Sequence, residues 1–574
     1  MIFKNQLYFF AEDSAAGREL WQSDGTVLGT AVIKDLVPGK PGIRYYPTTF
    51  GEFKQNSKHL FFAANDGSTG VELYRTDGTP SGTKRVADSK PGSGDGASPL
   101  TDAIIYKDKL FYNGKTNASG SYQLFISEGD SSNTIHVNTP MDSPSDFIIF
   151  NGKLLFKGSQ ASPRPGKYLY TISGSNASPV RLRNRSGKIF MAAGRSASFI
   201  DYWAKADHIL FFSAIDPDNL LASELFRTDG TSAGTWMLQE RNSSTDSGNL
   251  INPPQYGVDV FKGAWLAAIQ TEQYGLEMWK IKGPKAAQIV RDIEPGSGAG
   301  FVPKYIHAPV KILRHGAILN NEYYFRGRTK HKGVELWKTG GDSASTALVH
   351  DLVFGTVSSN PSLHPVPING ILIGSAFTYP TGDELFRTDG TASGSYILKD
   401  INPGVQPSNN QPRFSSVLPL DTLNNQLIFQ ADSNPIGNEL WITDGTVRGT
   451  RLLKDINPGP NSGTTKRVSG TVYSSKCNNN IFFTATDGIL GYELWKTDGT
   501  TAGTQMVKDI NQGNGDGSSG GNMVCLNDTL YFVGNNGTSG WELWKSAGSA
   551  ASTILVADIN PGADESFIRE LTLA

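Results

Sequence analysis

The sequence has little charge and no long apolar run. Charged residues make up 18% of the 574 positions, and the formal net charge is −2 at pH 7. A nearly neutral chain has no electrostatic attraction for nucleic acid or for an anionic membrane surface, so we expect neither as a partner. No stretch approaches the roughly 20 apolar residues that a membrane-spanning helix needs, so we expect no membrane insertion.

The beginning of the chain lacks the layout of a signal peptide. Residues 1–10 contain no charged segment followed by an apolar one, and they resemble part of a repeat unit. We therefore expect either a cytosolic protein or a leader that has been removed from the chain.

Cysteine is almost absent, with two residues in the whole sequence, Cys477 and Cys525. Both precede equivalent predicted strands of neighbouring repeats, offset by about one position. Buried free thiols are the interpretation we favour, and a disulfide between two repeats is the alternative.

Turn residues and aromatic residues, in contrast, are abundant. The chain has 64 glycines and 30 prolines, and aromatic residues make up 10% of it. This composition is typical of many short strands joined by turns. A motif of leucine or methionine followed by an aromatic residue recurs from one end of the chain to the other, preceded by glutamate in nine units and often followed by Asp-Gly-Thr. Its aromatic residue is Trp21, Tyr74, Phe125, Tyr170, Phe226, Trp279, Trp337, Phe386, Trp441, Trp495 and Trp544.

The repeat predicts an all-β propeller. Each unit contains four short β-rich runs separated by Asn-Gly, Asp-Gly and Pro-Gly turns, which indicates four antiparallel strands. Successive residues of a strand face opposite sides, so the leucine and the aromatic residue must be buried on different faces. A repeated antiparallel sheet that is buried on both faces is typical of a propeller blade. We expect about eleven four-stranded blades of ~52 residues each.

The spacing of the units suggests how they are divided. Units one to four occupy residues 1–182, and the third and fourth have lost Asp-Gly-Thr. Residues 183–207 are longer than a usual connection and form a predicted boundary or insertion, and residues 208–574 hold units five to eleven. We expect two rings rather than one large ring. The segment 566–574 is predicted to complete the blade that begins at the N-terminus, either in its own ring or in that of a neighbouring subunit.

The consensus is Glu-Leu-Trp-x-Thr-Asp-Gly-Thr-x-x-Gly-Thr, followed by Val-Lys-Asp-Ile-x-Pro-Gly, and its best copies are residues 72–83, 439–459 and 493–510. It resembles the family of bacterial repeat proteins that is named for the ELWxxDGT motif. That family is associated mainly with secreted or surface proteins of poorly defined function. The resemblance therefore implies an extracellular or cell-surface location and names no reaction.

The repeated carboxylates invite a catalytic interpretation. A catalytic pair occurs once in a site, however, whereas these carboxylates occur in almost every unit. Aspartate in a turn commonly accepts backbone N–H groups, and this structural role is the one we expect. We predict no catalytic residue, no cofactor and no metal; Ca²⁺ is the one ion considered, and no EF-hand loop is present to hold it.

Some aromatic residues are not required by the repeat. Trp203 lies near the 183–207 segment, and Trp541 stands beside a motif glutamate. Aromatic rings with nearby amides are used by sugar-binding sites, so these two residues are our candidate ligand contacts. The alternative for each is packing in the core.

Taken together, these features favour a non-enzymatic extracellular binding or assembly protein, such as an adhesin, a matrix protein or another structural protein of the cell surface. Its partner would be a protein, a second copy of the chain or a glycan. One alternative is a carbohydrate-binding, lectin-like propeller. The other is a polysaccharide-active enzyme with its site at the mouth of the ring.

Overall fold

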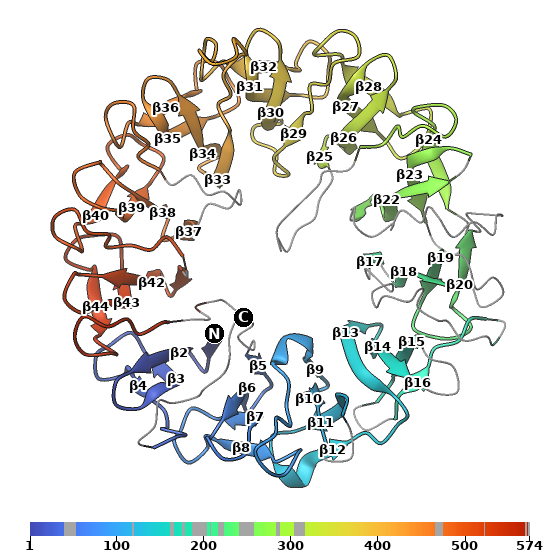
Figure 1. The fold of residues 1–574 in the computed structure, drawn as a ribbon. Helices are drawn as coiled ribbons and strands as arrows, with labels where there is room; N and C mark the ends of the chain where they lie inside the picture. Colours follow the sequence, from blue (N-terminus) through green and yellow to red (C-terminus); the bar gives the residue numbers. More distant parts are fainter. Residues whose placement is uncertain are drawn as a thin grey trace.

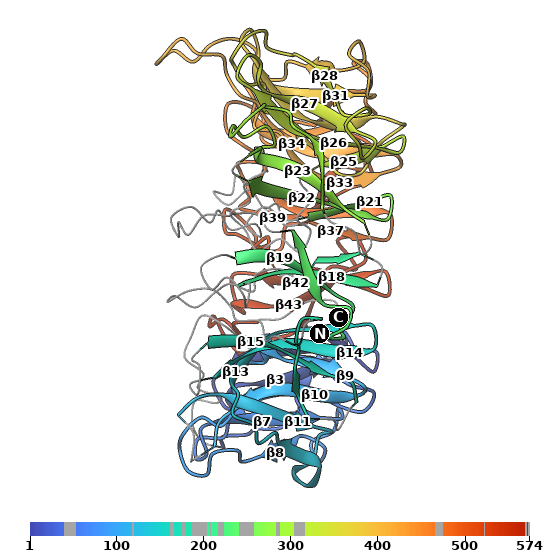
Figure 2. The same cartoon turned by 90° about the vertical axis from the view of Figure 1, so that its right-hand side faces the viewer.

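The computed structural model describes residues 1–38, 53–116, 120–160, 166–174, 178–185, 187, 204–206, 208–215, 223–239, 258–271, 273–282, 287–302, 316–464, 474–521, 523–568 and 571. These residues form eleven four-stranded antiparallel sheets, arranged as the blades of one ring (Figure 1). Seen from the side, the ring is a flat disc (Figure 2). The prediction of an all-β propeller of eleven blades is confirmed.

Each blade takes four consecutive strands, and the first of them lies nearest the centre of the ring (Figure 1). Blades 1 to 5 consist of β1 (Ile2–Phe3), β2 (Gln6–Asp13), β3 (Gly17–Ser23), β4 (Ala31–Val32); β5 (Lys54–Gln55), β6 (Leu60–Asn65), β7 (Val71–Thr76), β8 (Lys84–Ala87); β9 (Ile104–Tyr106), β10 (Lys109–Gly114), β11 (Gln123–Ser127), β12 (Thr134–His136); β13 (Asp142–Phe150), β14 (Lys153–Gln160), β15 (Gly166–Ile172), β16 (Val180–Arg181); and β17 (Ala204–Ala206), β18 (Ile209–Ile215), β19 (Ser223–Thr228), β20 (Trp236–Gln239).

Blades 6 to 11 continue in the same order. They consist of β21 (Val258–Phe261), β22 (Ala264–Thr271), β23 (Gly275–Ile281), β24 (Gln288–Arg291); β25 (Ala317–Leu319), β26 (Glu322–Thr329), β27 (Gly333–Thr339), β28 (Ala347–His350); β29 (Ser362–Leu363), β30 (Leu372–Thr378), β31 (Gly382–Thr388), β32 (Tyr396–Lys399); β33 (Leu418–Leu423), β34 (Gln426–Ser433), β35 (Gly437–Thr443), β36 (Arg451–Lys454); β37 (Ser474–Cys477), β38 (Asn480–Ala485), β39 (Glu493–Thr497), β40 (Gln505–Lys508); and β41 (Val524–Leu526), β42 (Thr529–Asn535), β43 (Trp541–Ser546), β44 (Ile554–Ala557).

Two short 3-10 helices, η1 (Leu100–Asp102) and η2 (Ser131–Asn133), interrupt this pattern in the described residues. Within the same residues, no helix is long and apolar enough to cross a membrane.

The core of the protein is a series of clusters, each between two neighbouring blades. Leu440 of blade 9 packs in one cluster with Trp495 of blade 10. Leu494, the residue before that tryptophan, packs in the next cluster with Trp544 of blade 11. The leucine and the aromatic residue of one strand therefore face opposite neighbours, as the alternation of side chains along a strand requires.

One ring replaces the two rings that the sequence favoured. The expected boundary lay between units four and five, but Leu169 of blade 4 and Phe226 of blade 5 share a buried cluster. Because this interface is packed like the others, no break divides the ring there. Most of segment 183–207 lies outside the described residues, and its residues 204–206 form β17, the first strand of blade 5.

The first blade and the described part of the tail meet where blade 11 joins blade 1, and the N-terminus lies inside the ring (Figure 1). The four described strands of blade 1 come from residues 2–32. Residues 569, 570 and 572–574 of the predicted final strand lie outside the described residues, so its sharing of blade 1 stays a prediction. The described part of the tail packs beside that blade: the Ser566 carbonyl accepts a hydrogen bond of 2.7 Å from the Glu12 N–H. Ile568 and Leu571 are buried in the same cluster as Trp21 and Leu543.

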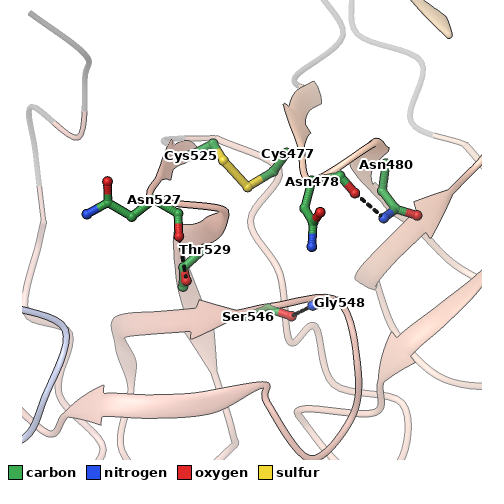
Figure 3. Close-up of a disulfide and its surroundings, with 8 residues drawn as sticks. All are labelled: Cys477, Asn478, Asn480, Cys525, Asn527, Thr529, Ser546 and Gly548. Carbon is green, nitrogen blue, oxygen red and sulfur yellow. Dashed lines mark hydrogen bonds between the residues drawn. A yellow bond between two sulfur atoms is a disulfide. The ribbon is translucent and has the colours of Figure 1, made fainter.

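The two cysteines are joined in a disulfide, contrary to the free thiols that we favoured (Figure 3). Cys477 ends β37 and Cys525 lies in β41, the innermost strands of blades 10 and 11. Their Cα atoms are 5.5 Å apart, within the usual range for a disulfide. The alternative of a bond between two repeats is therefore the one that the fold adopts.

Removing the tail contacts tests how the ring closes. The double substitution Ile568→Ala and Leu571→Ala removes two side chains that are 4% and 3% exposed. We expect it to lower the melting temperature of a monomer by several degrees, because each buried side chain contributes about 2–5 kcal/mol. The control is Phe567→Ala, which changes a neighbour that is 47% exposed. Calorimetry measures the melting temperature, and light scattering checks that the protein is a monomer. A double variant that melts at the same temperature as the control would contradict this closure.

Candidate functional site

The Asp-Gly-Thr turn between the third and fourth strands is a closed network of hydrogen bonds. In blade 10, Asp498 Oδ1 accepts the N–H of Thr500 at 2.8 Å and its hydroxyl at 2.7 Å. Thr500 Oγ1 accepts the Gly503 N–H at 2.9 Å, and the Thr504 hydroxyl donates to the Thr500 carbonyl at 2.7 Å. The bond from the Thr500 hydroxyl lowers the pKa of Asp498. Each motif residue thus has a role within the turn.

The glycine of this turn allows neighbouring blades to touch. Gly25 and Gly390 have φ of 88° and 91°, which side chains rarely adopt. A Cβ atom at either glycine would lie 2.1 Å from a tyrosine hydroxyl of the preceding blade, Tyr531 for Gly25 and Tyr324 for Gly390. The motif therefore serves the contact between blades.

The motif glutamate ties the third strand to the connection that leads to the next blade. Glu439 is fully buried, and its carboxylate accepts the backbone N–H groups of Ile456 at 2.8 Å, Asn457 at 3.4 Å and Gly463 at 2.7 Å. Burial raises the pKa of Glu439 to about 7. The same cause raises the pKa of the equivalent glutamates, to about 6 in Glu335, about 7 in Glu72, Glu493 and Glu542, and about 8 in Glu19, Glu277 and Glu384.

These repeated carboxylates occupy turns and buried connections in the blades that the structure describes. No group of three or more histidine, cysteine, aspartate or glutamate side chains that could hold a metal ion occurs in the described residues. The site must therefore be sought where a blade departs from the repeat.

Such a departure lies between blades 8 and 9 (upper left in Figure 1). In the ordinary connection after blade 9, seven positions separate Asn457 from Thr464. In the connection after blade 8, thirteen positions separate Asn402 from Ser415, so this connection is longer by six residues. The two ends correspond because Thr464 and Ser415 both donate their N–H to the residue before the motif glutamate.

The additional residues form a small hairpin. The N–H of Arg413 donates to the Gly404 carbonyl at 3.0 Å, and the N–H of Gln406 donates to the Gln411 carbonyl at 2.7 Å. The base of the hairpin lies against blade 8, because a Cβ atom on Gly382 would be 2.0 Å from the Arg413 carbonyl oxygen. The hairpin is therefore held by its backbone.

The turn between β34 and β35 faces this hairpin, and it also departs from the repeat. It contains a cis peptide bond between Asn434 and Pro435. Asn402 joins the two walls: its Oδ1 accepts the Asn434 N–H at 3.0 Å, and its Nδ2 donates to the Phe414 carbonyl at 2.9 Å. A pocket of about 400 Å³ lies between the walls, which we call the junction pocket. Its lining includes Gln406, Arg413, Phe414, Asp432, Asn434 and Pro435.

One aromatic residue, Phe414, lines the junction pocket, and its ring contacts others beside the lining. Phe414 is 43% exposed, and its ring meets that of Phe377 edge to face, with centroids 6.3 Å apart. The Phe377 ring in turn meets Tyr379, which is 58% exposed, at 5.7 Å. The pocket thus combines one exposed ring with a cation, a carboxylate and amides.

The two residues proposed from the sequence lie elsewhere. Trp203 is outside the described residues. Trp541 begins β43 and packs, partly buried, against the cluster that closes the ring. Its carbonyl accepts hydrogen bonds from the Ser566 N–H at 3.2 Å and hydroxyl at 2.9 Å. The sequence analysis missed the junction pocket, although the long interval between Asn402 and Ser415 is visible in the sequence.

Comparison with known proteins finds relatives among solved structures. No family model matches the chain, so the resemblance to the ELWxxDGT repeat family stays a prediction. No curated protein matches it either.

The chain is similar to a puromycin hydrolase, with 12% identity and a TM-score of 0.24 over 66% of this chain. It is similar to a prolyl endopeptidase, with 13% identity and a TM-score of 0.27 over 62%. A puromycin-hydrolyzing peptidase of Mycobacterium tuberculosis matches with 9% identity and a TM-score of 0.25 over 66%. The chain covers 58%, 49% and 57% of the length of these structures.

These neighbours correct the class of protein that the sequence suggested. We expected no enzyme but an adhesin, a matrix protein or a surface-structure component, whereas the three solved structures named above are peptidases. The non-enzymatic prediction was wrong and is withdrawn, and none of these three neighbours supports adhesion or carbohydrate binding. The correction ends there, because TM-scores of 0.24 to 0.27 assign no peptidase activity to this chain.

The raised glutamate pKa values predict how stability depends on pH. In the unfolded chain these glutamates titrate near 4.5, so the folded protein holds extra protons between about pH 4.5 and pH 8. This stabilisation is complete below the unfolded pKa and is lost as the pH rises through the folded values. The turn aspartates, whose pKa is lowered, act in the opposite direction below about pH 4. We expect a higher melting temperature at pH 5 than at pH 8.

Glu493→Gln tests the hydrogen bonds of the buried glutamate with a neutral side chain of similar size. The amide would place N–H groups opposite the N–H of Ile510 or Asn511, which the carboxylate accepts at 3.0 Å and 3.2 Å. We expect a loss of about 1–3 kcal/mol in unfolding free energy. Glu565→Gln, at an exposed position, is the control. Equal melting temperatures at pH 5 and pH 8, with no difference between the two variants, would contradict this role.

Proposed function

We propose that the protein recognises a segment of a partner protein in the junction pocket. The observation that carries the proposal is the pocket that lies between the longer connection after blade 8 and the turn between β34 and β35. A volume of about 400 Å³ falls within the range of ligand sites. The proposal concerns recognition and assigns no reaction.

The lining of the pocket favours a protein as the partner. Aromatic residues and arginine are enriched where proteins bind one another, and they carry a large share of the binding energy. Phe414 and Arg413 supply both kinds of side chain from adjacent positions. Gln406 and Asn434 add amide groups, which can donate to and accept from a peptide backbone.

We also propose an oxidising location, at the cell surface or outside the cell. The Cys477–Cys525 disulfide supports it, because disulfides persist in such compartments and are rare in the cytosol. Non-reducing mass spectrometry of the protein from its producing cells should find the two cysteines linked, in the medium or the surface fraction. Recovery from the cytosol with two thiols open to alkylation would contradict this location.

A loop exchange within the chain tests the recognition site. Residues 402–415 are replaced by the sequence of residues 457–464, the ordinary connection that already joins blades 9 and 10. We expect the variant to keep the melting temperature of the parent within a few degrees, because the buried glutamate contacts are retained. A phage-displayed random peptide library is selected on the parent protein, with the loop-exchange variant as the counter-selection.

The expected result is a set of peptides that bind the parent and not the loop-exchange variant. Arg448→Gln, an exposed substitution in the turn after β35, should bind the same peptides as the parent. Peptides that bind the parent and the loop-exchange variant equally, or a selection that enriches none, would contradict recognition at this pocket.

A further inference from the structure

We infer that the junction pocket takes the carboxyl terminus of a peptide whose last residue is aromatic or aliphatic. This inference rests on the proposed function and adds the chemical group that is recognised. The carboxylate binds Arg413, and the last side chain lies on Phe414.

Arg413 is placed to bind an anion. Its backbone is fixed at both sides, because its N–H donates to Gly404 and its carbonyl lies against Gly382. Its guanidinium makes one long hydrogen bond to the Pro403 carbonyl, at 3.5 Å, among the described residues. A guanidinium has five N–H donors in a planar fork, and two of them match the two oxygens of a carboxylate.

The neighbouring ring supplies the apolar part of the site. Phe414 follows Arg413 directly, so the cation and the exposed ring belong to adjacent residues of one hairpin. The edge-to-face contact with Phe377 supports the Phe414 ring from blade 8. A terminal carboxylate has its own side chain on the adjacent Cα atom, and the cation and the ring that would receive these two groups line the same pocket.

Asp432 limits the number of negative charges that the ligand can carry. It lies in the same lining, and its Oδ1 accepts a hydrogen bond of 3.1 Å from Asn438 Nδ2. A carboxylate in the lining repels ligands that carry several negative charges, such as a phosphate, and tolerates a single carboxylate paired with Arg413. The same side chain can accept N–H groups from a peptide backbone.

The rigidity of the two walls also favours a defined ligand. Asn402 is only 8% exposed and joins the hairpin to the cis-proline turn through its two hydrogen bonds. The Ser433 hydroxyl adds a bond of 2.8 Å to the Ile401 carbonyl. Because these contacts already hold the walls together, little ordering remains for the ligand to impose.

The test compares N-acetyl-Ala-Ala-Phe with a free carboxylate and the same peptide as its carboxamide. Titration calorimetry on the full chain should show binding of the carboxylate form and at least about tenfold weaker binding of the amide, because a hydrogen bond to a charged group contributes about 1.5–3 kcal/mol. Arg413→Gln should weaken the carboxylate form by a similar factor. Arg448→Gln, on an exposed turn, should leave it unchanged.

The aromatic contact has a matched pair of variants. Phe414→Ala should weaken binding of the free peptide severalfold. Phe354→Ala removes a ring that is 93% exposed in the connection after blade 7, and it should leave binding unchanged.

The outcomes separate this inference from the proposed function. If the carboxylate and the amide bind equally and the loop exchange abolishes both, the pocket recognises internal segments and the inference is overturned, while the proposed function stands. If neither form binds the parent protein, the inference is likewise overturned, and the peptide-library selection decides the proposed function separately. If binding persists in the loop-exchange variant, the peptide binds elsewhere and both proposals fall.

Discussion

Each blade of this ring depends on its neighbours, because the leucine and the aromatic residue of its third strand face opposite ways. Leu440 needs Trp495 of the next blade, and Trp441 needs Leu385 of the blade before it. A four-stranded sheet with two apolar faces has no stable surface in water, so the series must continue until it closes. The cluster that joins Leu543 to Trp21 closes it, with Ile568 and Leu571 of the tail filling the same space.

The polar part of the motif supports the stacking of the blades. Glu439 accepts three backbone N–H groups of a buried connection. Asp498 organises the Asp-Gly-Thr turn of blade 10, and in blades 1 and 8 the glycine of the equivalent turn lies against the preceding blade. Carboxylates with shifted pKa values are often taken as signs of function. Here the pKa of the equivalent glutamate is raised in many blades of the ring, because burial of its side chain disfavours the charged form.

The architecture of a single blade could be predicted from the sequence, whereas the number of blades in a ring could not. Strand alternation alone placed the leucine and the aromatic residue on opposite faces, and the clusters confirm this. Ring size depends on whether blades 4 and 5 touch, and the interval around residues 183–207 does not show that Leu169 reaches Phe226.

The site was missed for a related reason. The hairpin with Arg413 and the turn with Pro435 are separate in the sequence, and only packing brings them together. Trp541 stood out in the sequence as an extra aromatic residue, yet it packs at the closure of the ring. The disulfide likewise depends on β37 and β41 lying side by side, which the spacing of Cys477 and Cys525 left open.

The central claim is that the leucine–aromatic interfaces run without a break around one ring. Electron microscopy of the purified full-length chain tests it directly, because face-on views show the number and grouping of blades. Eleven blades around a single opening are the predicted result. Two smaller rings within one chain, or a ring completed by the tail of a second molecule, would contradict it.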